Sequence, residues 1–273
     1  MVETMTMTSD ISLARTVRLF MAPGEPTPDL AVNSYAALVS TPHLGVFYEF
    51  TLHCSGQPQY RTGFVESIYE MDRAVHGVLA PRINQAFKTG NVRPHTILQA
   101  SMHDLDQHLD ARLTRVDWQL TPTYRISMEA SDMTTFLLAQ NYQFAASHKL
   151  HNPEYDDATN RSVFGKCCNP NGHGHNYRLE VEIAVPSNPE SPGHGFSVID
   201  LDEVVQEHVI DDFDHTYLNL DIDDFSNCNP TVENITLICH KRLMTPLKNL
   251  GVKLRRIRLW ETEKTCCAYP AEA

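Results

Sequence analysis

The order of the predicted elements repeats along the 273-residue chain, and this repeat constrains the fold more than any other feature. Each half is predicted to contain two strands, then two helices, then two further strands. The correspondence is clearest in the last long strand of each half, where Arg115–Gln119 matches Arg256–Glu261 and both segments contain a tryptophan. Chance similarity is the alternative, but the shared order, lengths and tryptophan favour a repeat. We therefore expect an α+β protein with two similar domains, residues 11–130 and residues 134–271.

The second half shows this pattern in most detail. Tyr142–Ala145 is predicted to be a strand, and in His175–Val185 every second residue is apolar, as in a strand with one buried face. Between them we expect a loop over Asn152–Gly174, because Asn, Pro and Gly are frequent there. A short strand is expected at Phe196–Ile199, followed by a helix that Asp200 caps. The remaining elements are a helix after Pro230, capped by Thr231 or Asn229, and strands over Leu254–Trp260 and Cys266–Tyr269.

Composition and charge exclude several classes of protein. The formal net charge is -12, and no basic stripe is visible, so a nucleic-acid partner is not expected. No run of about 18 apolar residues occurs, so no membrane span is expected. The first ten residues lack the pattern of a signal peptide, which favours a cytoplasmic protein. The seven cysteines are an odd number without a secretion signal, so we expect reduced thiols.

Three histidines form a candidate metal site. His173 and His175 stand two residues apart at the start of a predicted strand, so the strand period of two places both imidazoles on one face. His148 ends the preceding predicted strand, and antiparallel pairing would bring it beside them. Three imidazoles leave zinc with an open position for substrate or water. Loop histidines without a metal are the alternative, which the motifs described next disfavour.

Cys167, Asp214 and His215 are candidates for acid–base chemistry. Cys167 lies in a polar loop next to Lys166, where a nearby zinc ion would stabilise its thiolate as a base. Asp214 precedes His215, and a carboxylate beside an imidazole raises its basicity and fixes its orientation. Taken singly, a buried structural cysteine and a solvated Asp-His pair are the alternatives.

Glu261 ends the last long strand, and its carboxylate could accept two parallel N–H donors. The 2-amino group and N3–H of a pterin ring offer such a pair. Taken alone, a surface glutamate at a strand end is the preferred interpretation.

Together these residues resemble the 6-pyruvoyltetrahydropterin synthase family, which also contains the 6-carboxytetrahydropterin synthases of queuosine biosynthesis. The resemblance extends from Phe136 to Tyr269. Its most specific part is the segment Phe164–Tyr177, with the sequence FGKCCNPNGHGHNY. Further matching segments are Asp214-His215, Pro230–Asn234 and Leu259–Thr262.

The resemblance implies tandem tunnelling-fold domains, in which four-stranded antiparallel sheets join into a barrel with pairs of helices outside. It implies a homo-oligomer with sites at subunit or domain interfaces. The implied metal is Zn²⁺, and its implied ligands are His148, His173 and His175. The implied catalytic residues are Cys167 as the base, with Asp214 and His215 as a proton relay. The implied pterin pocket contains Glu261 as the anchor, together with Thr231 and Glu233.

The implied substrate is 7,8-dihydroneopterin triphosphate. Lys149, Arg161 and Lys166 are candidates for binding its triphosphate, and Mg²⁺ is a candidate companion of that group. Members of the family that form the pyruvoyl product have five residues between the cysteine and the His-Gly-His motif, as do Cys167 and His173 here. This spacing favours 6-pyruvoyltetrahydropterin as the product. The alternatives are a 6-carboxytetrahydropterin synthase, which releases acetaldehyde, a non-catalytic pterin-binding protein, and a zinc hydrolase, which would have no use for Glu261.

The chain departs from the family at two points. Cys168 stands where the family usually has asparagine, so two neighbouring thiols compete for the role of base. The first half lacks the site, and only His43 survives, near the place of His175. The replaced positions of the first half are Gly24, Tyr35, Thr41, Arg82, Ile83 and Gln119. We expect this half to complete the barrel without catalysing.

Overall fold

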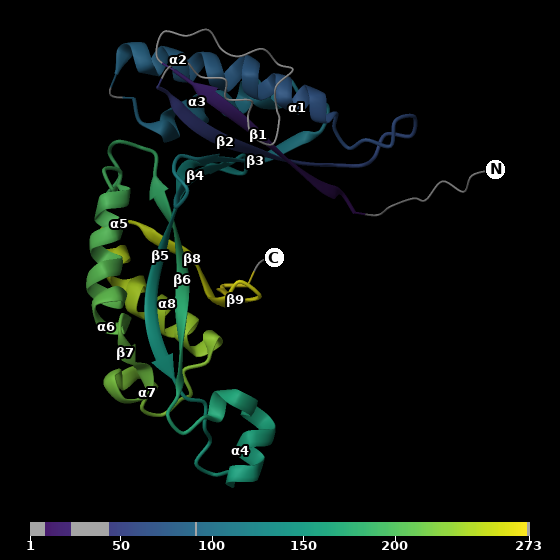
Figure 1. Cartoon of the computed structure of the whole chain (residues 1–273). Coiled ribbons are helices and arrows are strands. Elements are labelled where there is room, and N and C mark those ends of the chain that lie inside the picture. The colour runs from purple at the N-terminus through teal and green to yellow at the C-terminus, as the bar shows by residue number, and fades with distance from the viewer. Residues whose placement is uncertain (1–8, 23–43, 91, 272–273) are drawn as a thin grey trace, which may run out of the picture. The chain divides into compact units, whose positions relative to one another are not determined.

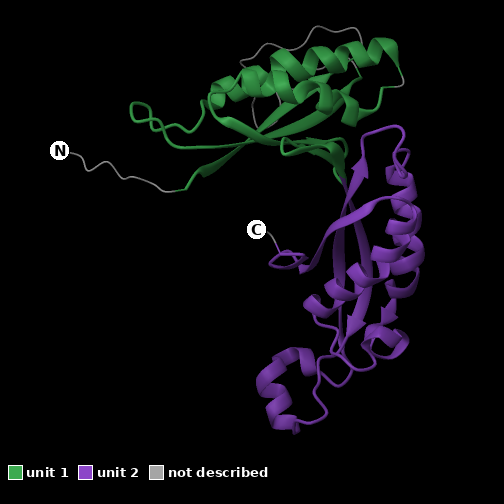
Figure 2. Ribbon diagram, turned by 180° about the vertical axis from the view of Figure 1, so that it is seen from behind, with its two compact units in different colours: residues 1–137 green, residues 138–273 purple. Residues whose placement is uncertain are grey.

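The computed structural model describes residues 9–22, 44–90 and 92–271. The chain divides into two compact units, Met1–Leu137 and Leu138–Ala273 (Figure 2). Both units combine helices with mainly antiparallel strands, so the predicted α+β class is confirmed. Within the described ranges, no helix has both the length and the hydrophobicity needed to cross a bilayer. Four first-half positions compared with site residues of the second half lie outside the described residues: Gly24, Tyr35, Thr41 and His43.

Unit 1 contains a sheet whose strands are hydrogen-bonded in chain order, each antiparallel to the next. These strands are β1 (Ile11–Met21), β2 (Val46–Gly56), β3 (Arg112–Gln119) and β4 (Tyr124–Glu129). One face of the sheet is covered by helices, namely α1 (Ile68–Ala74), η1 (Val75–Leu79), α2 (Ala80–Thr89) and α3 (Pro94–Gln107) (Figure 1). Phe50, Val116 and Trp118 point to this face and are at most 2% exposed, so the core of unit 1 lies between sheet and helices.

The other face of the unit 1 sheet carries an ionic cluster. Arg115 Nε donates to Asp117 Oδ1 at 2.6 Å, and His53 Nε2 lies 2.8 Å from Asp117 Oδ2. Burial would raise the pKa of Asp117, but the hydrogen bond with His53 and the charge of Arg115 outweigh it and hold that pKa well below its usual range. Asp117 is therefore ionised at neutral pH and neutralises a cation on the sheet.

Replacing Asp117 with asparagine is expected to lower the free energy of unfolding at pH 7 by about 3 kcal/mol, because Arg115 loses its nearest carboxylate. The difference should shrink as the pH falls through the aspartate range, since the unfolded carboxyl takes up a proton before the folded one does. Urea denaturation of the full chain at several pH values measures this, with the exposed Asp110→Asn as control. Equal stability of Asp117→Asn and the wild type at pH 7 would contradict the stabilising role.

Unit 2 contains the remaining strands. In hydrogen-bonding order they are β5 (Asp132–His148), which begins in unit 1, β6 (His173–Pro186), β8 (Lys253–Thr262) and β9 (Thr265–Tyr269). The short strand β7 (Thr216–Tyr217) runs parallel to β5. After β6 come the helical segments α5 (Val198–Val205), η3 (Gln206–Ile210), α6 (Asp211–Phe213), α7 (Leu218–Asp221), η4 (Asp223–Phe225) and α8 (Val232–Asn249) (Figure 1). On β6 the apolar residues Tyr177, Leu179 and Val181 are fully buried, as predicted. The expectation of a single buried face is wrong, because Glu180 and Glu182 of the other face are also buried, and Glu180 forms an ion pair with Arg258 on β8.

Two segments of unit 2 differ from the sequence-based expectation. The predicted loop Asn152–Gly174 contains helix α4 (Asp157–Phe164) and the short 3-10 helix η2 (Gly165–Cys168). Asp156 begins α4, because its carboxylate accepts a hydrogen bond from Thr159 N at 2.7 Å. The predicted strand at residues 196–199 is instead the start of α5, which Ser197 caps. Asp200 completes this cap from within the helix by accepting from Ser197 N at 2.7 Å.

Both units interrupt their first long helix with a π-helical turn. The turn η1 follows the seven residues of α1, and the turn η3 follows the eight residues of α5. In each unit the chain then returns to α-helix. This agreement supports a repeat, and the domains 11–130 and 134–271 remain the prediction for its extent.

Candidate active site

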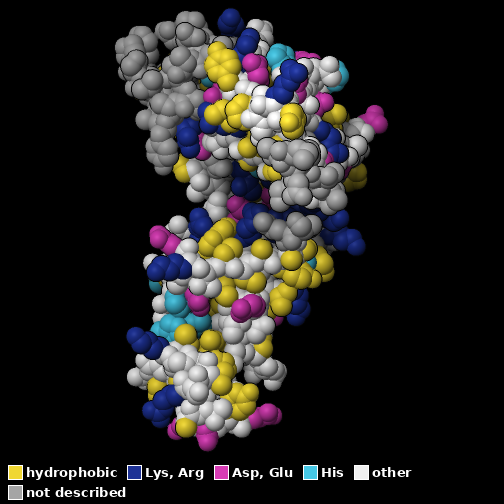
Figure 3. All heavy atoms as spheres, turned by 90° about the vertical axis from the view of Figure 1, so that its right-hand side faces the viewer, with side chains coloured by type: hydrophobic (Ala, Val, Ile, Leu, Met, Phe, Trp, Pro, Cys, Tyr) yellow, Lys and Arg dark blue, Asp and Glu magenta, His cyan; other side chains and the backbone are white. Residues whose placement is uncertain are grey.

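Three histidines converge where β5 ends and β6 begins. His148 is the last residue of β5, and His173 and His175 are the first and third residues of β6. His148 Nε2 lies 3.0 Å from His173 Nε2, and one ring nitrogen from each of the three lies within 4.8 Å of the others. The space-filling view shows histidine side chains gathered on the surface of unit 2, with Lys or Arg side chains close by (Figure 3). The strand pairing thus produces the cluster that the sequence predicts.

The histidine cluster fits a zinc ion. Bonds of about 2.0–2.1 Å to a tetrahedral zinc place two ligand nitrogens about 3.4 Å apart, close to the spacing of His148 and His173. His148 Nδ1 lies 2.6 Å from the carbonyl oxygen of Pro230. A carbonyl only accepts, so Nδ1 carries the hydrogen and Nε2 presents its lone pair to the cluster. His175 Nε2 is buried and has no hydrogen-bond partner among the described residues, as expected of a metal-binding atom.

Two imidazoles of the cluster, those of His148 and His173, are in the form that binds a metal. Burial is the main cause that lowers the pKa of His148, and burial also lowers the pKa of His173. Both rings are therefore neutral at pH 7, and a cation displaces no proton from them at this pH.

Glu261, at the end of β8, lies beside the cluster. Its Oε1 is 3.6 Å from His148 Nε2 and 3.7 Å from His175 Nε2. The carboxylate therefore faces the position that a metal and its bound ligand would share, and it can accept a proton or hydrogen bond there. The sequence predicts Glu261 as the anchor of a pterin ring, and that role stays a prediction.

Cys167 lies on η2, and the hydrogen bond from Leu150 N to Cys167 O, at 2.9 Å, ties η2 to the segment that follows His148. Partial burial and the charge of Glu261 both raise the pKa of the Cys167 thiol, so the thiol is protonated at pH 7 in the metal-free protein. A divalent cation on the neighbouring histidines would act in the opposite direction and favour the thiolate. The Cys168 thiol instead donates a hydrogen bond to the carbonyl oxygen of Gly165, with its Sγ 3.1 Å from that oxygen.

Asp214 and His215 form a pair at a second edge of the site. Asp214 Oδ2 lies 2.8 Å from His215 Nδ1, and Asp214 Oδ1 accepts from Ala145 N at 2.7 Å. The hydrogen bond from Ala145 is the main cause that lowers the pKa of Asp214. His215 has the left-handed φ of 61°, and its side chain is 82% exposed. A cavity of about 600 Å³ is lined by both His215 and His175, so the pair faces the same cavity as one histidine of the cluster.

The start of α8 is fixed to the histidine cluster through Pro230, which precedes Thr231. Thr231 caps α8 by accepting from Asn234 N at 3.3 Å, as the sequence predicts, and Glu233 lies exposed in the first turn. Both residues therefore follow closely in the sequence after the proline whose carbonyl accepts a hydrogen bond from His148. Their contacts with a pterin ring stay predictions. The Pro230 carbonyl was not foreseen, because a backbone oxygen leaves no mark in the sequence.

Gly172 holds the segment before His173 close to His148. Its φ is +69°, and a Cβ at this position would lie 2.8 Å from His148 O and 2.8 Å from Tyr217 Cε2. Gly172→Ala is therefore expected to displace His148 or His173 and to weaken zinc binding by about tenfold or more. Competition with a chromogenic chelator measures the affinity. Gly195→Ala is the control, because a Cβ there meets nothing within 4 Å. Equal zinc affinity in both variants would contradict the prediction.

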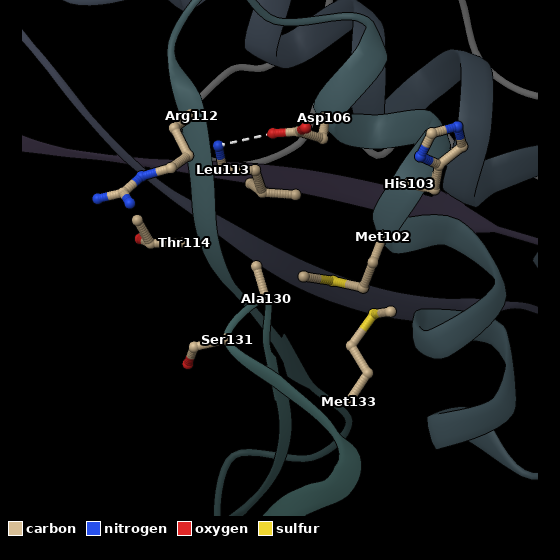
Figure 4. Close-up of a pocket in the computed structure, with 9 residues that line it drawn as sticks. All are labelled: Met102, His103, Asp106, Arg112, Leu113, Thr114, Ala130, Ser131 and Met133. Carbon is tan, nitrogen blue, oxygen red and sulfur yellow. Dashed lines mark hydrogen bonds between the residues drawn. The ribbon is translucent and has the colours of Figure 1, made fainter.

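Another cavity, of about 510 Å³, lies in unit 1, and two methionines are among the residues that line it. Figure 4 shows Met102 and Met133 pointing toward one another, and Asp106 accepting a hydrogen bond from Leu113 N at 2.9 Å. Among the described residues, the one group of three or more potential metal ligands is that of His148, His173 and His175. The candidate active site is therefore in unit 2.

Comparisons with known proteins concern the same half of the chain. The family model described as 6-pyruvoyl tetrahydropterin synthase matches residues 137–272. The 6-pyruvoyl tetrahydrobiopterin synthase of Drosophila melanogaster is 32% identical over 139 residues, which are 51% of this chain and 82% of that protein. The Homo sapiens protein of the same name is 32% identical over 135 residues, 50% of this chain and 91% of that protein.

A solved structure, that of Caenorhabditis elegans 6-pyruvoyl tetrahydropterin synthase, is 31% identical, covers 50% of this chain and 95% of its own, and has a TM-score of 0.45. The sequence relatives at above 30% identity are covered over most of their length. Through its second half, the chain belongs to the 6-pyruvoyl tetrahydropterin synthase family.

Proposed function

We propose that the chain is a zinc-dependent lyase that converts 7,8-dihydroneopterin triphosphate to 6-pyruvoyltetrahydropterin and triphosphate. The observation that carries the proposal is the convergence of three histidines with Glu261 and the Cys167 segment at one place in unit 2. A purely structural metal site is normally closed by a fourth protein ligand. In this proposal Glu261 binds the pterin ring rather than the ion, so the three histidines leave the metal an open position for the substrate.

Each side chain has a separate role in this proposal. His148, His173 and His175 hold the zinc, which supplies Lewis-acid polarisation of the substrate hydroxyls when bound. Cys167 takes a proton from the substrate side chain as its base. Asp214 orients His215 and supports its charge, so that the pair relays a proton to or from the same side chain.

The remaining contacts concern the pterin ring and the assembly. We assign Glu261 as the anchor of the ring, with Thr231 and Glu233 lining the pocket, because all three follow from motifs shared with the family. Glu261 also faces the histidines, so its carboxylate is positioned to hold the ring close to the metal. The proposed fold is a tandem tunnelling fold in a homo-oligomer, with Mg²⁺ accompanying the triphosphate.

The test is to incubate the zinc-loaded full chain with 7,8-dihydroneopterin triphosphate and to identify the products by mass spectrometry. We expect 6-pyruvoyltetrahydropterin and triphosphate. A 6-carboxy product with acetaldehyde would replace this assignment by the 6-carboxytetrahydropterin synthase reaction. The absence of turnover with one zinc bound per chain would reject the lyase and favour a pterin-binding protein.

A further inference from the structure

A third cavity, of about 430 Å³, gathers positive charge in unit 2. Lys149, Arg161 and Lys166 contribute three cations to its lining, against the single carboxylate of Asp157. This is a local reversal of sign in a chain whose formal net charge is -12. A cavity lined in this way attracts a multiply charged anion.

The three cations are not engaged elsewhere. None of their side chains forms an ion pair or hydrogen bond within the described part of the chain. Arg242 shows the contrast, because it bridges Asp212 at 2.5 Å and Asp224 at 2.6 Å. Cations that neutralise no carboxylate of the protein are free to bind an external anion.

The walls of this cavity are fixed by part-buried hydrogen bonds. Asn219 clamps the backbone of Lys149, accepting from its N at 2.7 Å and donating to its O at 2.8 Å. Asn160, which is 2% exposed, donates to Asn152 O and to Tyr155 O, each at 3.0 Å. The cavity is therefore formed before any ligand arrives, which reduces the entropy lost on binding.

The cavity adjoins the candidate active site along the chain. Two of its lining residues, Lys149 and Cys168, directly follow His148 and Cys167, and consecutive Cα atoms are about 3.8 Å apart. We propose that this cavity binds the triphosphate of the substrate while the side-chain hydroxyls lie at the histidine cluster. The inference rests on the proposed function for the identity of the substrate, but the anion site itself follows from the cavity and its charges.

Inorganic triphosphate is the probe that tests the site without catalysis. Titration calorimetry of the full chain without Mg²⁺ is expected to show binding that weakens as salt is added. Lys149→Ala and Arg161→Ala should each weaken it by about tenfold or more, since each removes a charged hydrogen-bond donor. Lys248→Ala removes an equal charge from the exposed end of α8 and should leave the affinity unchanged. Equal affinity in all four proteins, or no binding at millimolar triphosphate, would overturn the proposal.

Turnover assays separate this inference from the proposed function. For an active enzyme, Arg161→Ala should raise KM for 7,8-dihydroneopterin triphosphate about tenfold with a smaller change in kcat. Turnover by a chain that binds no triphosphate would reject the cavity alone. Arg161-dependent binding of triphosphate by a chain that turns over no pterin would uphold the anion site and reject the reaction.

Discussion

His173→Ala is expected to abolish stoichiometric zinc binding and, with it, turnover. Loss of a residue that merely supports a metal ligand typically costs 10–100-fold in affinity, so the loss of a ligand should exceed about 100-fold. The His173 ring packs mainly on His148 and His175, with centroids at 4.5 and 4.8 Å, so its removal disturbs little beyond the cluster. His148 is a poorer choice for this experiment, because it is completely buried and its truncation would also leave a cavity.

Zinc content after dialysis, measured by atomic emission, reports the loss directly. Thermal unfolding provides a second readout, because zinc should raise the melting temperature of the wild type but not of His173→Ala. His108→Ala, at an exposed position that ends α3 in unit 1, should keep one zinc per chain. Full zinc content in His173→Ala, with unchanged affinity, would show that the cluster does not hold the metal.

Cys167→Ala is expected to lose turnover by about 10²–10⁴-fold, the usual contribution of a general base, while keeping its zinc. Cys168→Ala should stay within a few-fold of the wild type. The structure distinguishes the two thiols, because the charge of Glu261 acts on Cys167, whereas Cys168 hydrogen-bonds to Gly165 O and lines the cationic cavity. Single-turnover rates with matched zinc content measure the chemical step in both variants. A larger loss in Cys168→Ala would transfer the role of base to that residue.

Strand periodicity made the histidine cluster predictable. The alternation in His175–Val185 predicted that His173 and His175 lie on the same face of β6. Antiparallel pairing with the preceding strand then predicted that His148, at the end of that strand, lies beside them. The helix α4 was missed because the signal for it is local and weak. Its cap Asp156 and its terminal Gly165, with φ +57°, stand in a segment whose composition favours loops.

Other features of the site depend on contacts between residues far apart in the sequence, which local sequence patterns do not predict. The clamp of Asn219 on Lys149 joins positions 70 residues apart, and the hydrogen bond that His148 donates to the Pro230 carbonyl joins positions 82 apart. The sequence suggests Lys149, Arg161 and Lys166 as triphosphate ligands, but only the path of α4 and η2 brings them to one cavity. Such long-range polar contacts form only after the strands have paired, so sequence patterns of helix and strand do not encode them.

The π-helical turns in the two units bear on the ancestry of the chain. A π turn closes its hydrogen bond over one residue more than an α turn, so it behaves as a single-residue insertion in a helix. If a gene for one domain was duplicated and fused, an insertion present before the fusion would be inherited by η1 and η3 alike. The alternative is that each half acquired its insertion independently, at the corresponding turn of its helix. Single-domain relatives that carry the same insertion would therefore mark the lineage from which both halves descend.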